Sequence, residues 1–381
     1  MRIAIVHDYL RETGGAERVL DVLAEMFPEA VVFTSYYADE IISDELRRHE
    51  IRTTFIQKLP ILWQSPNVLE RRGWDRVTRL INAWVYFLPA AFASLDVRAF
   101  DLVISSSSYC ADRVRTRPGQ MHVCYCHTPP RFLWQYSERY EGSSIKGRVW
   151  KRFVELLRRW DRRAVQRVDH FIANSENVRR RIKRFYDREA AVVYPQVDLL
   201  ERVRDFEPSG ENGGYYLVVS RLDEMKRVEV IVEAFNTSGK PLVIVGTGKL
   251  DARMLASANK NISFTGFLTD RELCLYYDRC EALVIAAIDE DFGITAVEAQ
   301  LFGKPVIAPA EGGFLETVVD GETGVLYEMD GPPSIVKAVE RARMIQFDTN
   351  RIKENAARFS KAAFIQGIST ELARIGVAIP K

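Results

Sequence analysis

The first half of the chain alternates between short apolar runs and longer stretches in which apolar residues recur at helical spacing. Most of the apolar runs are uninterrupted, which is typical of strands in a parallel sheet that is covered on both faces. Helices are predicted between them, including 16–26, 145–168 and 174–186, the last opening with a good N-cap pair, Asn174-Ser175. The predicted strands are residues 2–7, 31–35, 101–105, 121–127, 169–173 and 191–194.

The second half repeats this alternation. Its predicted strands are residues 215–219, 241–245, 261–264, 282–286, 305–308 and 323–327, with helical patterns between them. Strands that alternate with helices in this way predict an α/β fold with a doubly wound parallel sheet. The chain is therefore expected to form two Rossmann-like domains, one from each half.

Residues that break helices and strands crowd together at 197–214, where they predict a linker. We expect an N-terminal domain over 1–200 and a second domain over 206–357. Two doubly wound sheets that face each other leave a cleft lined by the carboxyl ends of their strands, and ligands are expected at those ends.

The length and the distribution of apolar residues agree with this plan. A chain of 381 residues is long for one domain and sufficient for two, each with its own core. No run approaches the 18 apolar residues of a membrane-spanning helix, and the N-terminus shows no signal-peptide pattern. We therefore expect the protein to be cytoplasmic.

The net charge of +1 conceals an uneven distribution. Residues 1–200 contain 32 basic and 25 acidic residues, a net of +7, whereas 201–381 contain 21 and 27, a net of −6. Within 131–190 the counts are 17 and 8, a net of +9. Such a segment suits phosphates, an anionic membrane surface or nucleic acid. Nucleic acid is not expected as a partner, because the segment contains no recognised RNA- or DNA-binding module and the remainder is acidic.

Two of the five cysteines, Cys124 and Cys126, alternate along a predicted strand and would share one of its faces. A metal site would need further ligands, and no second cysteine or histidine pair lies nearby in the sequence. Buried thiols are the favoured interpretation.

Two features of the first half could contact a ligand. Gly14 and Gly15 follow the first strand and precede a helix, where missing side chains let a ligand approach the backbone; a plain tight turn explains the pair about equally well. His127 lies at the end of another strand, opposite the two cysteines and just before Pro129-Pro130. A histidine held in this position suits a hydroxyl contact or proton transfer.

Two cations open the second domain. Arg221 and Lys226 follow its first strand, where the sheet is expected to open into the cleft. A guanidinium grips phosphate through two hydrogen bonds and an ammonium acts as a point charge, so the pair could converge on a diphosphate. The alternative is a pair of ordinary surface charges.

An acidic loop follows the strand at 282–286 and leads into a helix that starts near Gly293. Glu290 lies in the loop and Glu298 lies in the helix, on either side of free N–H groups that can hold a sugar or phosphate oxygen. Two such carboxylates suit hydroxyl recognition. Asp289 and Asp291 also fit a metal-binding Asp-x-Asp pattern, but the two cations already supply the charge of a magnesium ion.

These features occur together and in order in family-4 glycosyltransferases of the GT-B fold, which the sequence strongly resembles over nearly its whole length. The resemblance is closest to bacterial O-antigen and capsule mannosyltransferases that use GDP-mannose. It is carried by Gly14-Gly15-Ala16-Glu17, the block from Tyr125 to Trp134, Ser220-Arg221-Leu222 with Lys226, Gly246-Thr247-Gly248, Phe264-Thr265-Gly266-Phe267, residues 290–298 and Glu311-Gly312-Gly313. The stretch from Phe359 resembles the last helix of the family, which returns to the first domain, so 358–381 is assigned there.

The resemblance implies a role for each candidate residue. Catalytic roles fall to Arg221 and Lys226, which would bind the donor diphosphate and stabilise the leaving group, to Glu290, which would bind hydroxyls of the donor sugar, and to His127, which would contact that sugar. Substrate-binding roles fall to Gly14, Gly15, Gly266, Phe267, Phe292, Gly293, Ile294 and Glu298, with Glu298 on the nucleotide ribose. The family retains anomeric configuration and needs no metal or other cofactor.

The sequence departs from the family at two places. Ala296 stands where members usually have proline, and Glu224-Met225 stands where they have Pro-Tyr. Neither change touches the charged residues, but both weaken any inference about the base or sugar.

We therefore expect a retaining hexosyltransferase that moves mannose from GDP-mannose to a lipid-linked or surface-polysaccharide glycan, including polyprenyl-diphosphate-linked acceptors. The alternatives are a UDP-sugar-dependent enzyme of the same family and a non-catalytic protein that binds nucleotide sugars or nucleic acid. We also expect peripheral attachment to the inner face of the cell membrane. It would use helix 145–168 and the aromatic residues Trp63, Trp74, Trp84, Phe87 and Phe92, unless these aromatics belong to the core.

Overall fold

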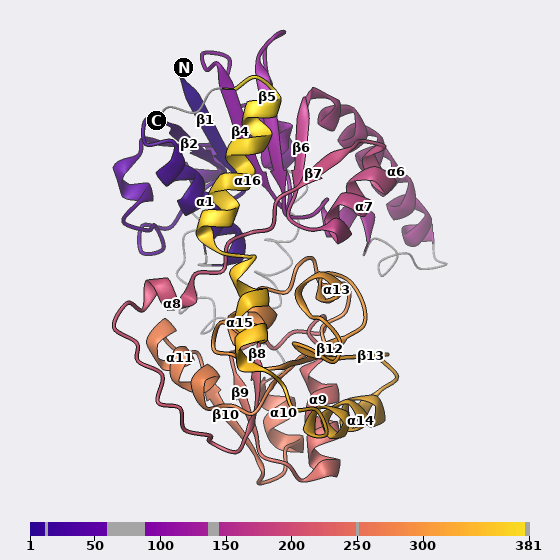
Figure 1. Cartoon of the computed structure of the whole chain (residues 1–381). Coiled ribbons are helices and arrows are strands. Elements are labelled where there is room, and N and C mark those ends of the chain that lie inside the picture. The colour runs from indigo at the N-terminus through magenta and orange to yellow at the C-terminus, as the bar shows by residue number, and fades with distance from the viewer. Residues whose placement is uncertain (12–13, 59–87, 136–144, 249–250, 378–381) are drawn as a thin grey trace. The chain divides into compact units, whose positions relative to one another are not determined.

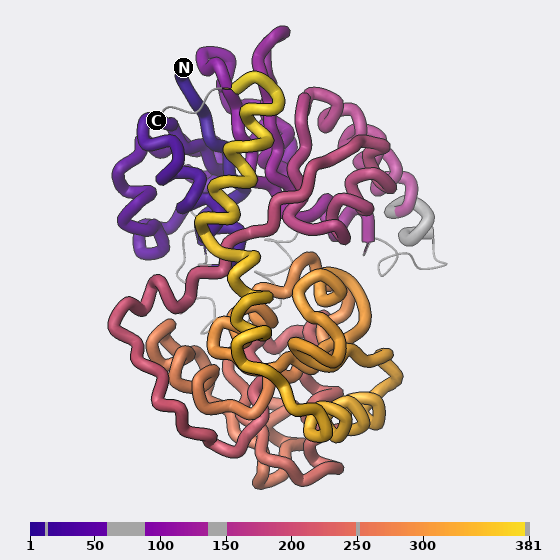
Figure 2. The backbone as a smooth tube through the Cα atoms, viewed as in Figure 1, coloured from indigo at the N-terminus to yellow at the C-terminus, as the bar shows by residue number. Residues whose placement is uncertain are grey.

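The computed structural model describes residues 1–11, 14–58, 88–135, 145–248 and 251–377. The chain forms two compact units, one of residues 1–194 with 365–381 and one of residues 195–364 (Figure 1). Figure 2 follows the two places where the backbone passes from one unit to the other.

The first unit contains a seven-stranded sheet in the order β3-β2-β1-β4-β5-β6-β7, with every neighbouring pair parallel. The strands are β1 (Ile3–His7), β2 (Val31–Thr34), β3 (Ile51–Thr53), β4 (Leu102–Ser107), β5 (Met121–Cys126), β6 (His170–Ala173) and β7 (Ala190–Val192). The six strands predicted in this half are all present. The short strand β3 was not predicted, because three partly exposed residues leave no apolar run.

Helices connect these strands. They are α1 (Gly15–Met26), α4 (Leu88–Ala93), α5 (Arg131–Trp134), α6 (Ile145–Ala164) and α7 (Glu176–Tyr186), with 3₁₀ turns at Leu46–Arg48, Phe55–Lys58, Ala111–Arg113 and Val165–Arg167. The predicted N-cap is confirmed at α7, where the Ser175 side chain accepts a hydrogen bond from the backbone N–H of Val178. The basic helix predicted over 145–168 ends as an α-helix at Ala164.

The second unit contains a six-stranded parallel sheet in the order β10-β9-β8-β11-β12-β13. Its strands are β8 (Tyr216–Val219), β9 (Leu242–Val245), β10 (Ile262–Gly266), β11 (Leu283–Val284), β12 (Val306–Pro309) and β13 (Gly324–Tyr327). Its helices are α8 (Leu199–Arg202), α9 (Val228–Ser238), α10 (Asp251–Ser257), α11 (Asp270–Arg279), α12 (Ile294–Leu301), α13 (Phe314–Thr317), α14 (Pro332–Arg343) and α15 (Thr349–Ala357). The last helix, α16 (Lys361–Arg374), begins in this unit and continues into the first. The predicted pair of doubly wound α/β domains is confirmed.

The strand order reverses direction at β8 in this sheet, between β9 on one side and β11 on the other. Apolar side chains pack on both faces of the sheet in two separate clusters, which include Val218 and Ile244 in one and Leu217 and Val245 in the other. A reversal of this kind leaves a crevice at the carboxyl ends of the strands.

The boundary between the units lies at Tyr194–Pro195, just before the stretch where the linker was predicted. The glycine-rich part of that stretch is attached to the second unit. The backbone N–H and the hydroxyl of Ser209 both bond to Asp278 at 2.7 Å, and the N–H of Gly213 bonds to the carbonyl of Arg279 at 2.8 Å. Most of α16 belongs to the first unit, where Glu371 pairs with His170 at 3.1 Å.

Two expectations about side chains are resolved. All five cysteines are free and buried, with Cys124 and Cys126 in one apolar cluster, which confirms that they are core thiols. Phe92 is also fully buried beside Leu88 and Ala91 on α4, so its predicted exposure to a membrane is wrong. Trp63, Trp74, Trp84 and Phe87 lie outside the described residues. No helix in the described ranges is long and apolar enough to cross a bilayer.

Candidate functional site

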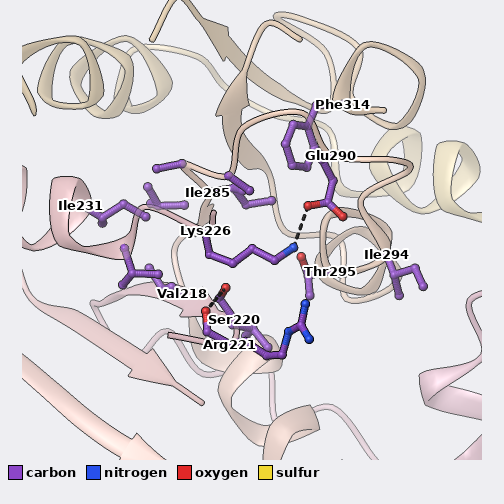
Figure 3. Close-up of a pocket in the computed structure, with 15 residues that line it drawn as sticks. Val218, Ser220, Arg221, Lys226, Ile231, Ile285, Glu290, Ile294, Thr295 and Phe314 are labelled. Atoms are coloured by element: carbon purple, nitrogen blue, oxygen red, sulfur yellow. Dashed lines mark hydrogen bonds and ion pairs between the residues drawn. The ribbon is translucent and has the colours of Figure 1, made fainter. Parts of the chain in front are cut away.

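A cavity of about 210 Å³ opens in the second unit (Figure 3). It lies after the carboxyl ends of β8 and β11 and beside the first turn of α12, which is the crevice expected where the strand order reverses. Apolar side chains form part of its wall, and charged side chains form another part. The lining residues are Val218, Val219, Ser220, Arg221, Lys226, Val228, Ile231, Val284, Ile285, Ala286, Ala287, Glu290, Ile294, Thr295 and Phe314.

Lys226 and Glu290 form an ion pair across this cavity. The ammonium Nζ lies 2.7 Å from Oε2 of Glu290, and both side chains are about three-quarters buried. Asp223 holds the backbone at Lys226. Its Oδ1 accepts hydrogen bonds from the backbone N–H of Lys226 at 3.2 Å and from that of Met225 at 3.0 Å. An ammonium carries three protons, so one that bonds to a carboxylate retains others that it can donate to a ligand.

Arg221 supplies a second cation at the same wall. Its side chain is 69% exposed, and its Nε lies 3.7 Å from Asp223. Figure 3 shows Arg221 and Thr295 beside the Lys226 ammonium. An exposed guanidinium near a partly buried ammonium can close on an anionic ligand once that ligand has bound.

The loop that carries Arg221 is fixed by close backbone packing against the end of β9. Gly246 has φ of +129°, and a Cβ there would lie 1.9 Å from the carbonyl oxygen of Ser220. The N–H of Leu222 bonds to the carbonyl of Thr247 at 3.0 Å. The Gly246-Thr247-Gly248 motif therefore positions the cationic loop.

The acidic loop before α12 is fixed in a similar way by the Glu311-Gly312-Gly313 motif. The N–H of Gly313 bonds to the carbonyl of Glu290 at 2.9 Å, and Oε1 of Glu311 accepts the N–H of Asp289 at 3.0 Å. Gly293 then begins α12 with φ of +92°, where a Cβ would lie 2.8 Å from the ring of Phe314. Ile294 and Thr295 of the first turn thus line the cavity, and the first N–H groups of an α-helix have no carbonyl partner in a preceding turn; that of Ala296 bonds to the carbonyl of Gly293 at 3.0 Å.

The site combines two cations, one carboxylate and the start of a helix with an apolar surface. The cations and the helix N-terminus attract phosphate oxygens, and the carboxylate accepts hydrogen bonds from hydroxyl groups. This arrangement can bind a phosphate ester that also presents hydroxyls, and it can stabilise negative charge that grows on the phosphate.

The cavity brings together four of the predicted site residues, namely Arg221, Lys226, Glu290 and Ile294. Five others in this unit do not line it. Glu298 is 4% exposed and accepts a hydrogen bond from the Tyr277 hydroxyl at 3.0 Å, and Phe292 packs its buried ring against Phe359. Gly293 lies at the helix start, Gly266 ends β10, and Phe267 is 81% exposed.

Eleven of the lining residues were not predicted; eight of these are aliphatic, and the other three are Ser220, Thr295 and Phe314. Ser220 and Thr295 lie inside the quoted motifs, so their hydroxyls beside charged neighbours were the available signal. Phe314 follows the Glu311-Gly312-Gly313 motif directly, but nothing in its own sequence environment distinguishes it from a core residue.

The two aspartates of the Asp-x-Asp pattern lie outside the wall of the cavity. Asp289 and Asp291 are partly buried and do not line the cavity. Across the part of the chain that the structure describes, no group of three or more histidine, cysteine or acidic side chains could hold a metal ion.

The first unit holds the remaining predicted residues. Gly14 caps α1, and its N–H donates to Oε2 of Glu17 at 3.0 Å; Gly15 is the first residue of that helix. His127 follows β5 and is 8% exposed, with its Nε2 2.8 Å from Oγ of Ser106. Burial, together with the nearby His7, lowers the pKa of His127 to about 3, so its ring is neutral at pH 7.

Two family models match the chain and together cover almost all of it. The model described as Glycosyltransferase Family 4 matches residues 13–200, and the model described as Glycosyl transferases group 1 matches residues 201–359.

Sequence relatives and a solved structure are also similar to this chain, and both relatives are named as mannosyltransferases. The chain is 26% identical to O-antigen chain mannosyltransferase C of Escherichia coli over 224 residues, which are 55% of this chain and 60% of that protein. The chain thus spans less than two thirds of that relative's length. It is 25% identical to alpha-1,3/1,6-mannosyltransferase ALG2 of Debaryomyces hansenii, over 84% of this chain and 76% of that protein. The structure matches Anabaena HepE in complex with UDP-glucose with a TM-score of 0.65 at 18% identity, covering 98% of this chain and 100% of that one, and shares its GT-B fold.

Proposed function

From the premise that the chain belongs to glycosyltransferase family 4, we propose that it transfers a hexose from a nucleotide-diphosphate donor to a glycan acceptor, with retention of anomeric configuration. The observation that carries the proposal is the cavity of the second unit, where Lys226, Arg221 and Glu290 line one space beside the start of α12.

Each part of that cavity has a task in the proposed reaction. As the glycosidic bond breaks, negative charge grows on the departing diphosphate, and Lys226 and Arg221 stabilise it together with the N–H groups at the start of α12. Glu290 accepts hydrogen bonds from hydroxyls of the donor sugar. In a front-face reaction the departing phosphate oxygen takes the proton of the acceptor hydroxyl, so no separate carboxylate nucleophile is required.

We propose mannose from GDP-mannose as the donor. Its support is that both sequence relatives named above are mannosyltransferases. The second candidate is a UDP-sugar, because the structural relative holds UDP-glucose. For the acceptor we propose a lipid-linked or growing surface glycan, including one carried on a polyprenyl diphosphate.

A thermal-shift panel of GDP- and UDP-sugars tests the donor. A ligand that binds only the folded protein adds about 2.7 kcal/mol of stability at 100 times its dissociation constant, so GDP-mannose should raise the melting temperature. The same ligand should have a smaller effect on Lys226→Ala, which loses a phosphate contact, and should still stabilise Lys240→Ala, whose lysine pairs with Glu340. A shift with a UDP-sugar and none with GDP-mannose would select the second candidate.

We further propose that helix α6 lies on an anionic membrane at the inner face of the cell membrane. Phe153, Leu156 and Trp160 are 41%, 62% and 37% exposed and are spaced to share one face of the helix. Arg159 and Arg163 are exposed on the same helix. Exposed aromatic and aliphatic groups beside arginines are typical of a helix that rests in the headgroup region.

Vesicle flotation tests this attachment. Leu156→Gln with Trp160→Gln should weaken binding to anionic vesicles at low salt by about tenfold or more, since burial of each such side chain contributes about 1.5–3 kcal/mol. Added salt should weaken wild-type binding too. Met344→Gln removes an exposed apolar group of the second unit and should change nothing. Equal binding by the double variant would exclude α6.

A further inference from the structure

Four polar side chains form a continuous chain of contacts inside the first unit. Oε1 of Glu17 lies 3.7 Å from Nε2 of His7, Nδ1 of His7 lies 3.1 Å from Oγ of Ser106, and the same Oγ lies 2.8 Å from Nε2 of His127. His7, Ser106 and His127 are all buried, and the Glu17 carboxylate is only 12% exposed. The catalytic role given above to His127 makes no use of the other three residues.

The sheet itself brings these residues together. His7 ends β1 and Ser106 lies opposite it on β4, in register. His127 comes directly after β5, the next strand, and Glu17 lies in the first turn of α1. Carboxyl ends of neighbouring parallel strands meet at one edge of a sheet, which is why residues 99 and 21 positions apart are in contact here.

The direction of each hydrogen bond follows from the carboxylate. Burial raises the pKa of Glu17, but the nearby His7 ring, 3.7 Å away, and the hydrogen bond from the N–H of Gly14 outweigh burial and lower it, so this carboxylate is ionised at neutral pH and can only accept. It therefore favours a proton on Nε2 of His7. The bare Nδ1 of His7 then accepts from the Ser106 hydroxyl, and Oγ of Ser106 accepts from Nε2–H of His127.

The consequence reaches the far side of the last ring. A neutral histidine carries one ring proton, so a proton on Nε2 leaves Nδ1 of His127 as a bare acceptor. In this state Nδ1 of His127 accepts a hydrogen bond from a hydroxyl and cannot donate one, while Nε2–H donates to Ser106.

We propose that Glu17, acting through His7 and Ser106, is a positioning residue that fixes His127 in the Nε2–H tautomer, so that Nδ1 accepts a hydrogen bond from a hydroxyl of the donor sugar. This inference rests on the proposed function and on the role that the family resemblance implies for His127, a contact with the donor sugar. It adds three residues to the machinery of the first unit and assigns a direction to the contact.

The same two strands contain a matched pair for comparison. Oγ of Ser105 lies 2.9 Å from Nε2 of His122, and both side chains are fully buried. Ser105 directly precedes Ser106 on β4, and His122 lies on β5 five residues before His127. Ser105→Ala therefore removes an equivalent serine–histidine contact outside the chain of four residues.

Histidine-selective ¹⁵N labelling reads the tautomer directly, because the protein has only five histidines. In wild type, Nδ1 of His127 should show the chemical shift of a bare nitrogen and Nε2 that of a protonated one. Glu17→Gln should reverse them. The N–H of Gly14 holds the amide oxygen at the position of Oε2, so the amide nitrogen faces His7 and donates to it, and each hydrogen bond as far as His127 reverses.

A second variant covers the case in which Glu17→Gln is poorly folded. Ser106→Ala breaks the chain at its centre and should leave His127 as a mixture of tautomers, whereas Ser105→Ala should leave the His127 shifts unchanged. Unchanged His127 shifts in both Glu17→Gln and Ser106→Ala would overturn the proposal.

Kinetics test the contact with the sugar. Glu17→Gln should lower kcat/KM by up to about tenfold, because a donor hydroxyl would have to turn and accept from a ring N–H where it had donated to a bare nitrogen. Ser105→Ala should match wild type. A reversed tautomer with unchanged kcat/KM would overturn the sugar contact. Absence of transfer by the wild type with every nucleotide sugar would refute the proposed function, and the tautomer measurement would still stand by itself.

Discussion

Replacement of Lys226 by alanine is expected to lower the rate of sugar transfer by about 100- to 1000-fold, and Arg221→Ala is expected to do the same. Preorganised electrostatic contacts to a developing negative charge typically contribute that much to turnover. Lys226 lies 2.7 Å from Glu290 at the cavity wall, so its removal also takes away the cation that balances this carboxylate where the diphosphate would bind. Steady-state rates with the donor identified by thermal shift measure both effects.

Lys240→Ala provides the matched control. Lys240 also pairs with a glutamate, at 3.1 Å from Glu340, in the same unit, but it does not line the cavity. Its loss should leave turnover near the wild-type value. Near-normal activity in Lys226→Ala would show that the leaving group is stabilised elsewhere.

The same electrostatic argument predicts that chelation of metals leaves activity largely intact. If the two cations and the start of α12 neutralise the diphosphate, EDTA should have little effect and Asp291→Asn should be mild. Loss of activity in EDTA, with recovery on addition of magnesium or manganese, would contradict this and assign a metal to the loop of Asp289 and Asp291.

The second large effect concerns stability. Arg113→Ala is expected to lower the free energy of unfolding by about 3–5 kcal/mol, because it leaves buried carboxylates without their partner. The Arg113 side chain is fully buried; it forms an ion pair with Asp112, donates from Nε to Asp161 at 2.9 Å, and lies 3.2 Å from the Tyr186 hydroxyl. Burial disfavours its charge, but the two aspartates outweigh burial and raise its pKa above the ordinary value.

Urea unfolding followed by tryptophan fluorescence measures this change, since the indole N–H of Trp134 donates to Asp161 at 2.8 Å and lies in the same cluster. Arg98→Ala is the control. Arg98 pairs with Asp96 in the same unit, but both side chains are more than 60% exposed, and water replaces such a partner readily. An unfolding midpoint for Arg113→Ala that equals that of Arg98→Ala would contradict the prediction.

The strands and their class were predictable from the sequence because they depend on local patterns. All twelve predicted strands are present, since a continuous apolar run of four to six residues between turn signals favours a strand buried on both faces. The short strand β3 lacked this signal. Phe92 was misjudged because its burial depends on α4 packing against the sheet, which a single aromatic residue does not reveal.

The site shows the same division. The positions of three site residues after strand ends could be predicted from the sequence, because charged residues that follow apolar runs indicate the carboxyl edge of a parallel sheet. These residues are Arg221, Lys226 and Glu290, and all three line the cavity. The contact of Lys226 with Glu290 and the position of Phe314 beside them depend on the tertiary structure. The same is true of the contacts that connect Glu17, His7 and Ser106 to His127. Strand order and register place Ser106 beside His7, 99 positions away, and beside His127, 21 positions away, and that placement depends on the packing of the whole sheet, which no local pattern contains.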